Sequence, residues 1–305
     1  MSISDSEKSM TSDSNNLNDS DKSRSGRDEV SDGAKSHGSD NGSDGAKPIL
    51  TRHEAPLGWL IVNRPQVKNA LNYEAWCGII AAMEELNADP DVRVIIMRGV
   101  TADSFISGAD ISEFPSHRAD AEQARAYREA PGNATNALTQ SPKPVVAMIA
   151  GICIGGGLQV ALSCDIRIAA RATRFGIPAA RLGLAYPLEG VLSLSHVTGP
   201  ANARDILMSA RIFDAEEALA MGLINRLVEP AELEAVVRDY ATRMAANAPL
   251  TLSAAKATIR ESLKDAAERD TKKIAAMVSQ CFDSEDYREG VKAFLEKHRP
   301  NFRGR

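Results

Sequence analysis

Short, uninterrupted apolar runs recur along the chain from about residue 48 onward. The first, Trp59–Val62, ends at Asn63-Arg64-Pro65, which is typical of a turn. Further runs occupy 93–97 (RVIIM), 144–149 (PVVAMI) and 166–169 (IRIA). Apolar runs of this length, bounded by turn signals, indicate buried strands. We therefore predict four buried strands in this part of the chain.

Other segments place their apolar residues three and four positions apart, which indicates helices. Residues 72–87 follow this spacing, and Asn72 is suited to cap the helix N-terminus. Beyond Gly199, helices dominate, and we predict them at 201–209, 215–221, 230–247, 249–263 and 266–281. This order of strands and helices predicts an α/β fold of repeated strand–strand–helix turns with a helical C-terminal third.

Residues 1–47 differ in composition from the rest of the chain. They are dominated by Ser, Asp, Gly, Asn and Lys, and the pentapeptide SDGAK occurs at Ser31–Lys35 and again at Ser43–Lys47. A segment with so few apolar residues cannot offset the entropy that it loses on ordering. We predict a disordered low-complexity tail over 1–47, a core over 48–245 and a helical C-terminal region over 246–305. A tail that docks on a partner is the alternative.

Composition narrows the classes of function. The 305 residues carry a net charge of −5, which argues against a nucleic-acid-binding protein, and no apolar run is long enough to span a bilayer. The four cysteines, Cys77, Cys153, Cys164 and Cys281, form no CxxC pair. Their spacing favours reduced, packed thiols over a disulfide or a metal site. We therefore expect a cytoplasmic protein with no metal ion and no nucleic-acid or membrane partner.

The first chemically informative stretch is Ala150–Gln159 (AGICIGGGLQ), which follows a strand and opens an apolar helical run. Its three consecutive glycines, Gly155–Gly157, let the backbone approach a ligand closely and adopt positive φ. Free N–H groups at the start of the next helix favour negative charge. Tight packing and a phosphate loop are the alternatives, and the phosphate loop is disfavoured because no Gly-Lys-Ser/Thr follows.

The second stretch is Ser104–Ile111 (SFISGADI), shortly after the predicted strand at 93–97. By itself it indicates only a loop with a small-residue turn and a capping Asp110. Together, the two stretches resemble the motifs of the crotonase, or enoyl-CoA hydratase/isomerase, family. IAGICIGGGLQVALSCDIRIA resembles the central glycine motif of that family, and SFISGADI resembles its upstream oxyanion and adenine loop.

The resemblance extends over residues 50–305, which is nearly everything except the tail. Further matching segments are 63–65 (NRP), 69–71 (NAL), 175–178 (FGIP), 182–184 (LGL) and 218–228 (ALAMGLINRLV). The resemblance implies a crotonase-type spiral of ββα turns, followed by C-terminal helices that supply trimer contacts. A homotrimer or a dimer of trimers is therefore expected.

For the site, the resemblance implies a thioester oxyanion hole formed by the backbone N–H groups of Ala109 and Gly156. Such donors stabilise the negative charge that develops on the carbonyl oxygen of an acyl-CoA. The resemblance also implies that the adenine lies against the loop and that the phosphates meet basic side chains. Coenzyme A is then part of the substrate, and no separate cofactor is expected. The residues assigned to substrate binding are Arg64, Lys68, Ala70, Ser107, Gly108, Asp110, Ile111, Gly155 and Tyr186.

Two positions depart from the family pattern. Hydratases of the family use two carboxylates, one three residues after the oxyanion glycine and one after the proline of Phe-Gly-x-Pro. Here these positions are Gln159 and Ala179, and of the two only Gln159 can orient a water molecule, without taking up its proton. Glu189 is a candidate catalytic acid or base, with a capping or surface carboxylate as the alternative. Tyr186 is a candidate donor to the acyl group, with a packed aromatic ring as the alternative.

We therefore expect an enzyme that acts on an acyl-CoA thioester through an enolate. Hydration or isomerisation of an enoyl-CoA is the default reaction, and hydrolysis or another enolate reaction stays open. The alternative is a non-catalytic acyl-CoA-binding or assembly protein on the same fold, because both family carboxylates are missing.

Overall fold

The computed structural model describes residues 47–113 and 121–305, without the side chains of 121–128. Gly45–Arg305 forms one unit of the chain and Met1–Asp44 another. Residues 1–46 of the predicted tail lie outside the described residues, so the predicted disorder stays a prediction.

A six-stranded sheet has the order β1-β2-β3-β5-β7-β10. β1 pairs antiparallel with β2, and the remaining neighbours are parallel. The four predicted strands are confirmed as β2, β3, β5 and β7, with small shifts at their ends. The bounds are β1 Ile49–Glu54, β2 Leu57–Val62, β3 Val94–Gly99, β5 Val145–Ile149, β7 Ile166–Ala170 and β10 Arg226–Val228.

A second, four-stranded sheet has the order β4-β6-β8-β9. Along the chain, strands of the two sheets alternate: β3 is followed by β4, β5 by β6 and β7 by β8. Each of these pairs is followed by a helix, α2, α3 or α4, which confirms the predicted spiral of ββα turns. The bounds are β4 Ser104–Ile106, β6 Ile152–Ile154, β8 Arg174–Gly176, β9 Ile212–Asp214, α2 Ala121–Gln140, α3 Gly156–Leu162 and α4 Leu188–Ser209.

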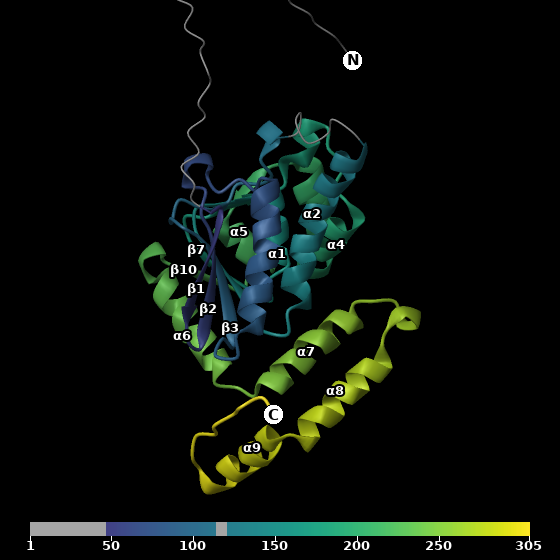
Figure 1. The fold of residues 1–305 in the computed structure, drawn as a ribbon. Coiled ribbons are helices and arrows are strands. Elements are labelled where there is room, and N and C mark those ends of the chain that lie inside the picture. The colour runs from purple at the N-terminus through teal and green to yellow at the C-terminus, as the bar shows by residue number, and fades with distance from the viewer. Residues whose placement is uncertain (1–46, 114–120) are drawn as a thin grey trace, which may run out of the picture. The chain divides into compact units, whose positions relative to one another are not determined.

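Successive side chains of the large sheet enter two separate cores. On β3, Ile95 and Met97 belong to the core shared with α1 (Tyr73–Ala88), whereas Val94 and Ile96 belong to the core shared with α6 (Leu233–Ala245). Figure 1 shows α6 on one side of this sheet and α1 on the other. Because both faces are covered, the central strands β2, β3 and β5 are nearly continuous apolar runs, whereas the edge strand β1 (ILTRHE) carries polar residues.

The helix predicted at 72–87 is confirmed as α1, and it begins as expected. Asn72 is its N-cap, and the side-chain oxygen of Asn72 accepts a hydrogen bond from the N–H of Ala75 at 3.0 Å. This contact satisfies one of the N–H groups that a helix start leaves unpaired.

Three other predicted helices have different bounds. The helix predicted at 201–209 starts at Leu188 as part of α4, with a kink at Gly199, whose φ is +77°. The one predicted at 230–247 is a 3-10 turn, Pro230–Glu232, followed by α6, because Pro230 favours a first turn and has no N–H to donate. The one predicted at 266–281 is interrupted by Asp270, whose side chain caps α8 (Thr271–Asp283).

Apolar spacing does not predict α2 at all. Pro131 and Gly132 lie inside this helix, and both residue types are breakers when a sequence is considered alone. The helix forms nevertheless, and its residues Ala134 and Leu138 are fully buried in the core shared with α1. Tertiary packing therefore overrides local propensity here.

The C-terminal helices α7 (Pro249–Ser262), α8 and α9 (Glu285–Glu296) pack in sequence, α7 on α8 and α8 on α9. Lys256 of α7 connects them to the sheet region, because its Nζ lies 2.8 Å from Asp165 Oδ2 and donates to the carbonyl oxygens of Leu138 and Lys143. These helices leave large apolar side chains exposed: Ile259, Leu263, Val278, Phe282, Tyr287, Val291, Phe294 and Leu295.

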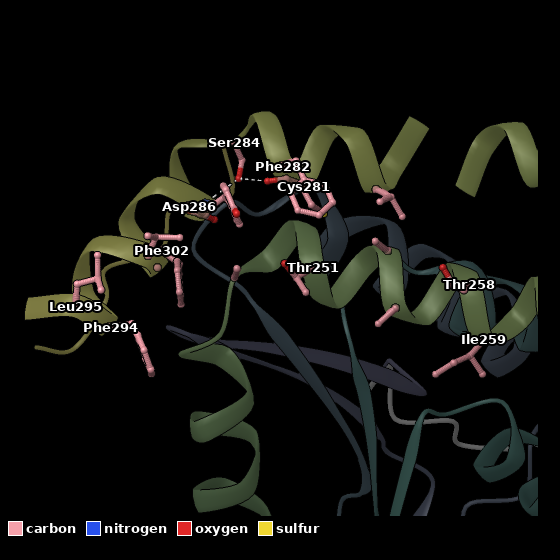
Figure 2. A pocket seen from close by; sticks show the side chains of 17 residues that line it. Thr251, Thr258, Ile259, Cys281, Phe282, Ser284, Asp286, Phe294, Leu295 and Phe302 are labelled. Atoms are coloured by element: carbon pink, nitrogen blue, oxygen red, sulfur yellow. Dashed lines mark hydrogen bonds between the residues drawn. The ribbon is translucent and has the colours of Figure 1, made fainter. Parts of the chain in front are cut away.

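An apolar cavity of about 890 Å³ lies among the same three helices. Figure 2 shows its lining side chains, which come from α7, α8, α9 and Phe302 near the C-terminus. The cavity contains none of the residues that the sequence assigns to the thioester site.

One surface contact joins β1 to the end of α1. His53 Nε2 lies 2.7 Å from Glu85 Oε1, and His53 Nδ1 lies 2.6 Å from Asp89 Oδ2. The hydrogen bonds to Glu85 and Asp89 raise the pKa of His53 above its ordinary value.

A His53→Gln variant should therefore lose stability in a pH-dependent way. Because the folded pKa is raised, the contribution of His53 is fully present below the unfolded pKa of about 6.5 and is lost as pH rises through the folded value. The difference in Tm between parent and variant should be largest near about pH 6 and shrink towards about pH 9. The effect should be small, because the His53 side chain is 40% exposed. Thermal denaturation over a pH series measures it.

The same substitution in a background with Glu85→Gln and Asp89→Asn is the control, and it should change Tm little at any pH. A parent-to-variant difference that stays constant across the pH series would contradict the assignment.

Candidate active site

Two turns approach each other at the site, one at Gly108–Ala109 and one at Gly155–Gly156. Gly108 has a φ of +127° and Gly155 a φ of +55°, so both turns use a conformation that favours glycine. A Cβ placed on Gly156 would lie 3.4 Å from the Ala109 nitrogen, and one placed on Gly108 would lie 4.0 Å from the Gly156 nitrogen. The structure therefore brings Ala109 and Gly156 together.

The N–H groups of Ala109 and Gly156 have no acceptor among the described residues. Leu71 N donates to Gly108 O at 2.8 Å, and Asp110 N donates to Leu71 O at 2.9 Å, so the pairing on either side of Ala109 leaves its own N–H unused. Gly156 is the first residue of α3, where an N–H has no partner within the helix. Two unpaired donors this close together are suited to binding one oxygen that gains negative charge.

The two glycines at the start of α3 have different surroundings. A Cβ on Gly157 would lie 2.2 Å from the carbonyl oxygen of Ile106, so α3 packs directly on the end of β4. A Cβ on Gly156 would meet only ordinary contacts at 3.4 Å, to Ala109 N and to the ring of Trp76. Trp76 of α1 is 2% exposed and forms the wall behind Gly156.

Gln159, one turn further along α3, contacts Tyr186. The Tyr186 hydroxyl lies 3.3 Å from Gln159 Oε1 and 3.4 Å from the carbonyl oxygen of Gly155. Burial raises the pKa of Tyr186 above its ordinary value, so the phenol keeps its proton and acts as a donor. Gln159 Oε1 accepts from this hydroxyl and keeps a second lone pair, and the Gln159 amide also carries two N–H groups that can donate.

Gly190, in the first turn of α4, packs against the side chains of Gln159 and Tyr186. A Cβ on Gly190 would lie 2.6 Å from Tyr186 Cε1 and 2.9 Å from Gln159 Oε1. The preceding residue, Glu189, is exposed, and its carboxylate has no partner in the part of the chain that the structure describes. Glu189 is therefore adjacent in sequence to Gly190, which packs on Gln159 and Tyr186. Glu189 itself forms no hydrogen bond with either of these two side chains. Ala179 lies in a 3-10 turn, Pro178–Leu182, and is partly buried against the core shared with α1.

Arg64 and Asp110, both assigned to substrate binding, pair with each other. Arg64 Nη1 lies 2.9 Å from Asp110 Oδ2 and donates to the carbonyl oxygen of Ala70. Burial by itself raises the pKa of Asp110, but hydrogen bonds from Ser112 and Arg64 outweigh it, so that this pKa lies below its ordinary value. Asp110 is therefore charged at neutral pH.

The remaining assigned residues surround this pair. Lys68 and Ile111 are exposed, Ile111 to 51%, whereas Ser107 is half-buried and its N–H donates to Lys68 O at 3.2 Å. Asn69, fully buried, was not assigned a role, although it occurs in the Asn-Ala-Leu segment of the motif. Its Oδ1 accepts from Arg64 N at 2.9 Å, and its Nδ2 donates to Ser104 O at 2.7 Å.

Residues 47–113 and 121–305 contain neither a helix that could span a membrane nor, among their described side chains, a metal-binding cluster. In this range no group of three or more described His, Cys, Asp or Glu side chains is placed to hold a metal ion. Its helices are all too short or too polar to cross a membrane.

A family model described as enoyl-CoA hydratase/isomerase matches residues 53–305. The chain belongs to the enoyl-CoA hydratase/isomerase family. Crotonyl-CoA hydratase of Syntrophomonas wolfei is 34% identical to this family member over 254 residues, which are 83% of this chain and 97% of the relative. Methylmalonyl-CoA decarboxylase of Escherichia coli is 33% identical over 243 residues, which are 77% of this chain and 90% of the relative.

A solved structure of an enoyl-CoA hydratase/carnithine racemase from Magnetospirillum magneticum has the same fold as this enoyl-CoA hydratase/isomerase family member. The TM-score is 0.81 at 37% identity, with 85% of this chain and 97% of that chain covered. The predicted family and the predicted spiral fold are thereby confirmed, and the protein is an enzyme of a family that acts on CoA thioesters.

Gly157→Ala and Gly156→Ala should differ sharply in stability. The Gly157 methyl would overlap a backbone oxygen that cannot move freely, and overpacking of this kind costs about 1–3 kcal/mol or more. The Gly156 methyl meets only ordinary contacts, so we expect a change within about 0.5 kcal/mol. Urea denaturation followed by circular dichroism measures both. Equal losses in the two variants would contradict the described packing of α3 on β4.

Proposed function

We propose that this protein binds the carbonyl oxygen of an acyl-CoA thioester between the N–H groups of Ala109 and Gly156 and stabilises the enolate formed from it. The observation that carries the proposal is the pair of unpaired backbone donors on two facing glycine turns. Membership of the family supports a CoA thioester as the substrate.

The energetic role of these donors follows from where charge develops. Enolisation moves negative charge from the α-carbon onto the carbonyl oxygen, and donors that are already oriented need no reorganisation as the charge appears. Removal of one such donor typically costs about 2.7–4 kcal/mol of transition-state stabilisation. Because the donors are backbone groups, a side chain at either position acts mainly by its volume.

The exposed loop residues support the proposed position of coenzyme A. Ile111 presents an exposed apolar side chain on which an adenine can stack, and we place the rest of the adenine contact at the half-buried Ser107 and the adjoining Gly108. The exposed ammonium of Lys68 is suited to the phosphates. Ala70 and Gly155 adjoin the two donor turns, so we place the thioester end of the substrate near them.

The first candidate reaction is hydration or isomerisation of an enoyl-CoA. Gln159 would orient the water molecule, and Glu189 would exchange the proton that neither Gln159 nor Ala179 can exchange. The support for Glu189 is its unpaired carboxylate beside Gly190, which itself contacts Gln159 and Tyr186.

The second candidate reaction is decarboxylation of a 2-carboxyacyl-CoA, and the donor character of the Gln159–Tyr186 pair favours it. In this reaction the bond between the α-carbon and the carboxylate breaks, CO₂ leaves, and the bonding electrons enter the enolate, which then takes a proton from solvent. The departure of CO₂ needs no general base. The Gln159 N–H groups are suited to a substrate carboxylate, and the Tyr186 hydroxyl could turn its single O–H from Gln159 Oε1 to that carboxylate. One relative at 33% identity is named methylmalonyl-CoA decarboxylase.

The exposed apolar face of the C-terminal helices and the free cysteines bear on assembly and cellular location. We propose a homotrimer, or a dimer of trimers, formed through α7, α8 and α9, because these helices expose a large apolar face that water does not favour. The largest exposures on this face are those of Phe294 (84%) and Leu295 (73%). A cytoplasmic location is supported by the four cysteines, all of which are free thiols.

Gly156→Ala should abolish thioester chemistry without unfolding the protein. The added methyl would lie 3.4 Å from Ala109 N and occupy the space in which the substrate oxygen must lie about 2.7–3.1 Å from both donors. We expect kcat/KM to fall at least about 100-fold. Loss of the conjugated thioester absorbance with crotonyl-CoA, and CO₂ release from methylmalonyl-CoA, measure the two candidate reactions.

Gly132→Ala on α2 is the matched control, because a Cβ there meets nothing within 4 Å. It should leave activity unchanged. A folded Gly156→Ala variant with the turnover of the parent would refute the proposed oxyanion site. A parent that binds acyl-CoA but converts none of the substrates would favour the non-catalytic alternative.

Tyr186→Phe and Glu189→Gln separate the two candidate reactions. If the Tyr186 hydroxyl binds a substrate carboxylate, its removal should lower kcat/KM for methylmalonyl-CoA about 10–100-fold, since a hydrogen bond to a charged group contributes about 1.5–3 kcal/mol. Glu189→Gln should then leave this reaction nearly unchanged but reduce any hydration of crotonyl-CoA. The opposite pattern, with methylmalonyl-CoA turnover lost only in Glu189→Gln, would contradict the assigned role of Tyr186.

A further inference from the structure

The turn that carries Ala109 is held by a partly buried ion pair. Asp110 directly follows Ala109, and Arg64 lies in the turn after β2, 46 residues earlier. Arg64 Nη1 contacts both Asp110 Oδ2, at 2.9 Å, and the carbonyl oxygen of Ala70. The Arg64 and Asp110 side chains are only 16% and 13% exposed. One guanidinium therefore joins two segments that are distant in sequence.

The backbone of Arg64 is itself fixed by the buried Asn69. Arg64 N donates to Asn69 Oδ1 at 2.9 Å, and Asn69 N donates back to Arg64 O at 2.8 Å. Asn69 Nδ2 also donates to the carbonyl oxygen of Ser104 at 2.7 Å, and Ser104 begins the strand that leads into the Ala109 turn. Arg64 is thus anchored at its backbone as well as at its guanidinium.

Both carboxylate oxygens of Asp110 are occupied. Oδ2 accepts from Arg64, and Oδ1 accepts from the hydroxyl of Ser112 at 2.6 Å and from its N–H at 3.2 Å. On the backbone, Asp110 N donates to Leu71 O at 2.9 Å. Asp110 is therefore held on both sides, and Leu71 N donates to Gly108 O at 2.8 Å, the carbonyl of the same peptide group as the Ala109 N–H.

We propose that Arg64 and Asp110 are positioning residues, whose ion pair aims the Ala109 N–H at the thioester carbonyl, and that neither of them contacts the phosphates of coenzyme A. The inference rests on the proposed function, because the Ala109 N–H is the group that is positioned. A displacement of about 1 Å in a reacting geometry can cost about 100-fold in rate.

A phosphate contact is the competing role for Arg64, and only a contact through its Nε or Nη2 group would leave the Asp110 pair intact. The Nη1 group is already shared between a carboxylate and a carbonyl oxygen, and drawing it towards a phosphate would leave the Asp110 charge unpaired while mostly buried. Lys68 lies nearby on the same turn with an exposed ammonium and no such partner among the described residues.

The decisive experiment compares two substrates that differ in the phosphates. Arg64→Lys, Arg64→Met and Asp110→Asn are assayed with an acyl-CoA and with the same acyl group on N-acetylcysteamine, which lacks both adenine and phosphates. We expect kcat to fall about 10–100-fold in Arg64→Met, by the same factor for both substrates, with KM for the acyl-CoA changed less than about threefold. A loss that appears only in KM, and only with the acyl-CoA, would overturn the proposal in favour of a phosphate contact.

The double variant Arg64→Met with Asp110→Asn tests whether the two residues act through each other. Residues that act as a unit are not additive, so the double variant should lose no more activity than the worse single variant. Losses that multiply would show that the two residues act independently and would overturn the proposal.

Arg98→Met is the matched control for removal of a half-buried arginine. Arg98 Nη1 lies 3.0 Å from Glu234 Oε2, its Nε donates to Gly99 O, and its side chain is 21% exposed. It therefore has the same kinds of contact as Arg64 without touching the Ala109 turn. Arg98→Met should retain the kcat of the parent even where it lowers Tm as much as Arg64→Met does.

A readout without turnover separates this inference from the proposed function. A CoA thioester of a conjugated aromatic acid changes its absorption maximum when its carbonyl oxygen accepts hydrogen bonds, because charge moves towards that oxygen. The parent and Arg98→Met should shift the band, whereas Arg64→Lys should bind within about threefold of the parent affinity and shift it less. No shift in the parent would refute the proposed oxyanion site, and an undiminished shift in Arg64→Lys would refute the positioning role.

Discussion

The close approach of two backbone turns is the constraint on which the site depends. β4 and β6 pair in parallel, so their carboxyl ends meet at one edge of the small sheet, and each strand continues directly into a glycine turn. α3 packs so tightly on the end of β4 that Gly157 has no room for a Cβ. The two unpaired N–H groups come close together because Gly108, Gly155 and Gly156 place no side chain between the turns.

The chemistry available around the two N–H donors depends on how the neighbouring side chains are themselves hydrogen-bonded. Tyr186 is buried and keeps its proton, so its hydroxyl donates to Gln159 and leaves the Gln159 amide as a further donor. The Asp110 carboxylate is neutralised by Arg64, and Glu189 is exposed at the start of α4. The surroundings of the donor pair thus combine neutral N–H and O–H groups with the exposed carboxylate of Glu189.

The C-terminal helices expose apolar side chains to water. α7 is connected to the sheet region by the nearly buried Lys256, while the side chains of α8 and α9 leave an apolar face and the cavity of Figure 2 exposed to water. An apolar face of this extent is unfavourable on a single chain. The proposed assembly through these helices would cover it, and the donor site lies on other elements.

Local patterns in the sequence determined a large part of this protein. Apolar runs identified β2, β3, β5 and β7, because strands of a sheet covered on both faces have few polar positions, and Asn72 identified the start of α1. The glycine motif and the SGAD loop indicated Ala109 and Gly156 through the resemblance. The spacing did not reveal α2, whose Pro131 and Gly132 are tolerated only because Ala134 and Leu138 are buried.

Only the tertiary structure decided which side chains pair. It joined Arg64 to Asp110 across 46 residues, placed Asn69 between Arg64 and Ser104, and set Tyr186 against Gln159 under Gly190. None of these pairings has a local signature, because hydrogen bonds between distant segments depend on strand register and helix packing. The sequence thus determined which backbone turns the site contains and which acids it lacks. The packing of the two sheets decided which groups remain free to contact a substrate.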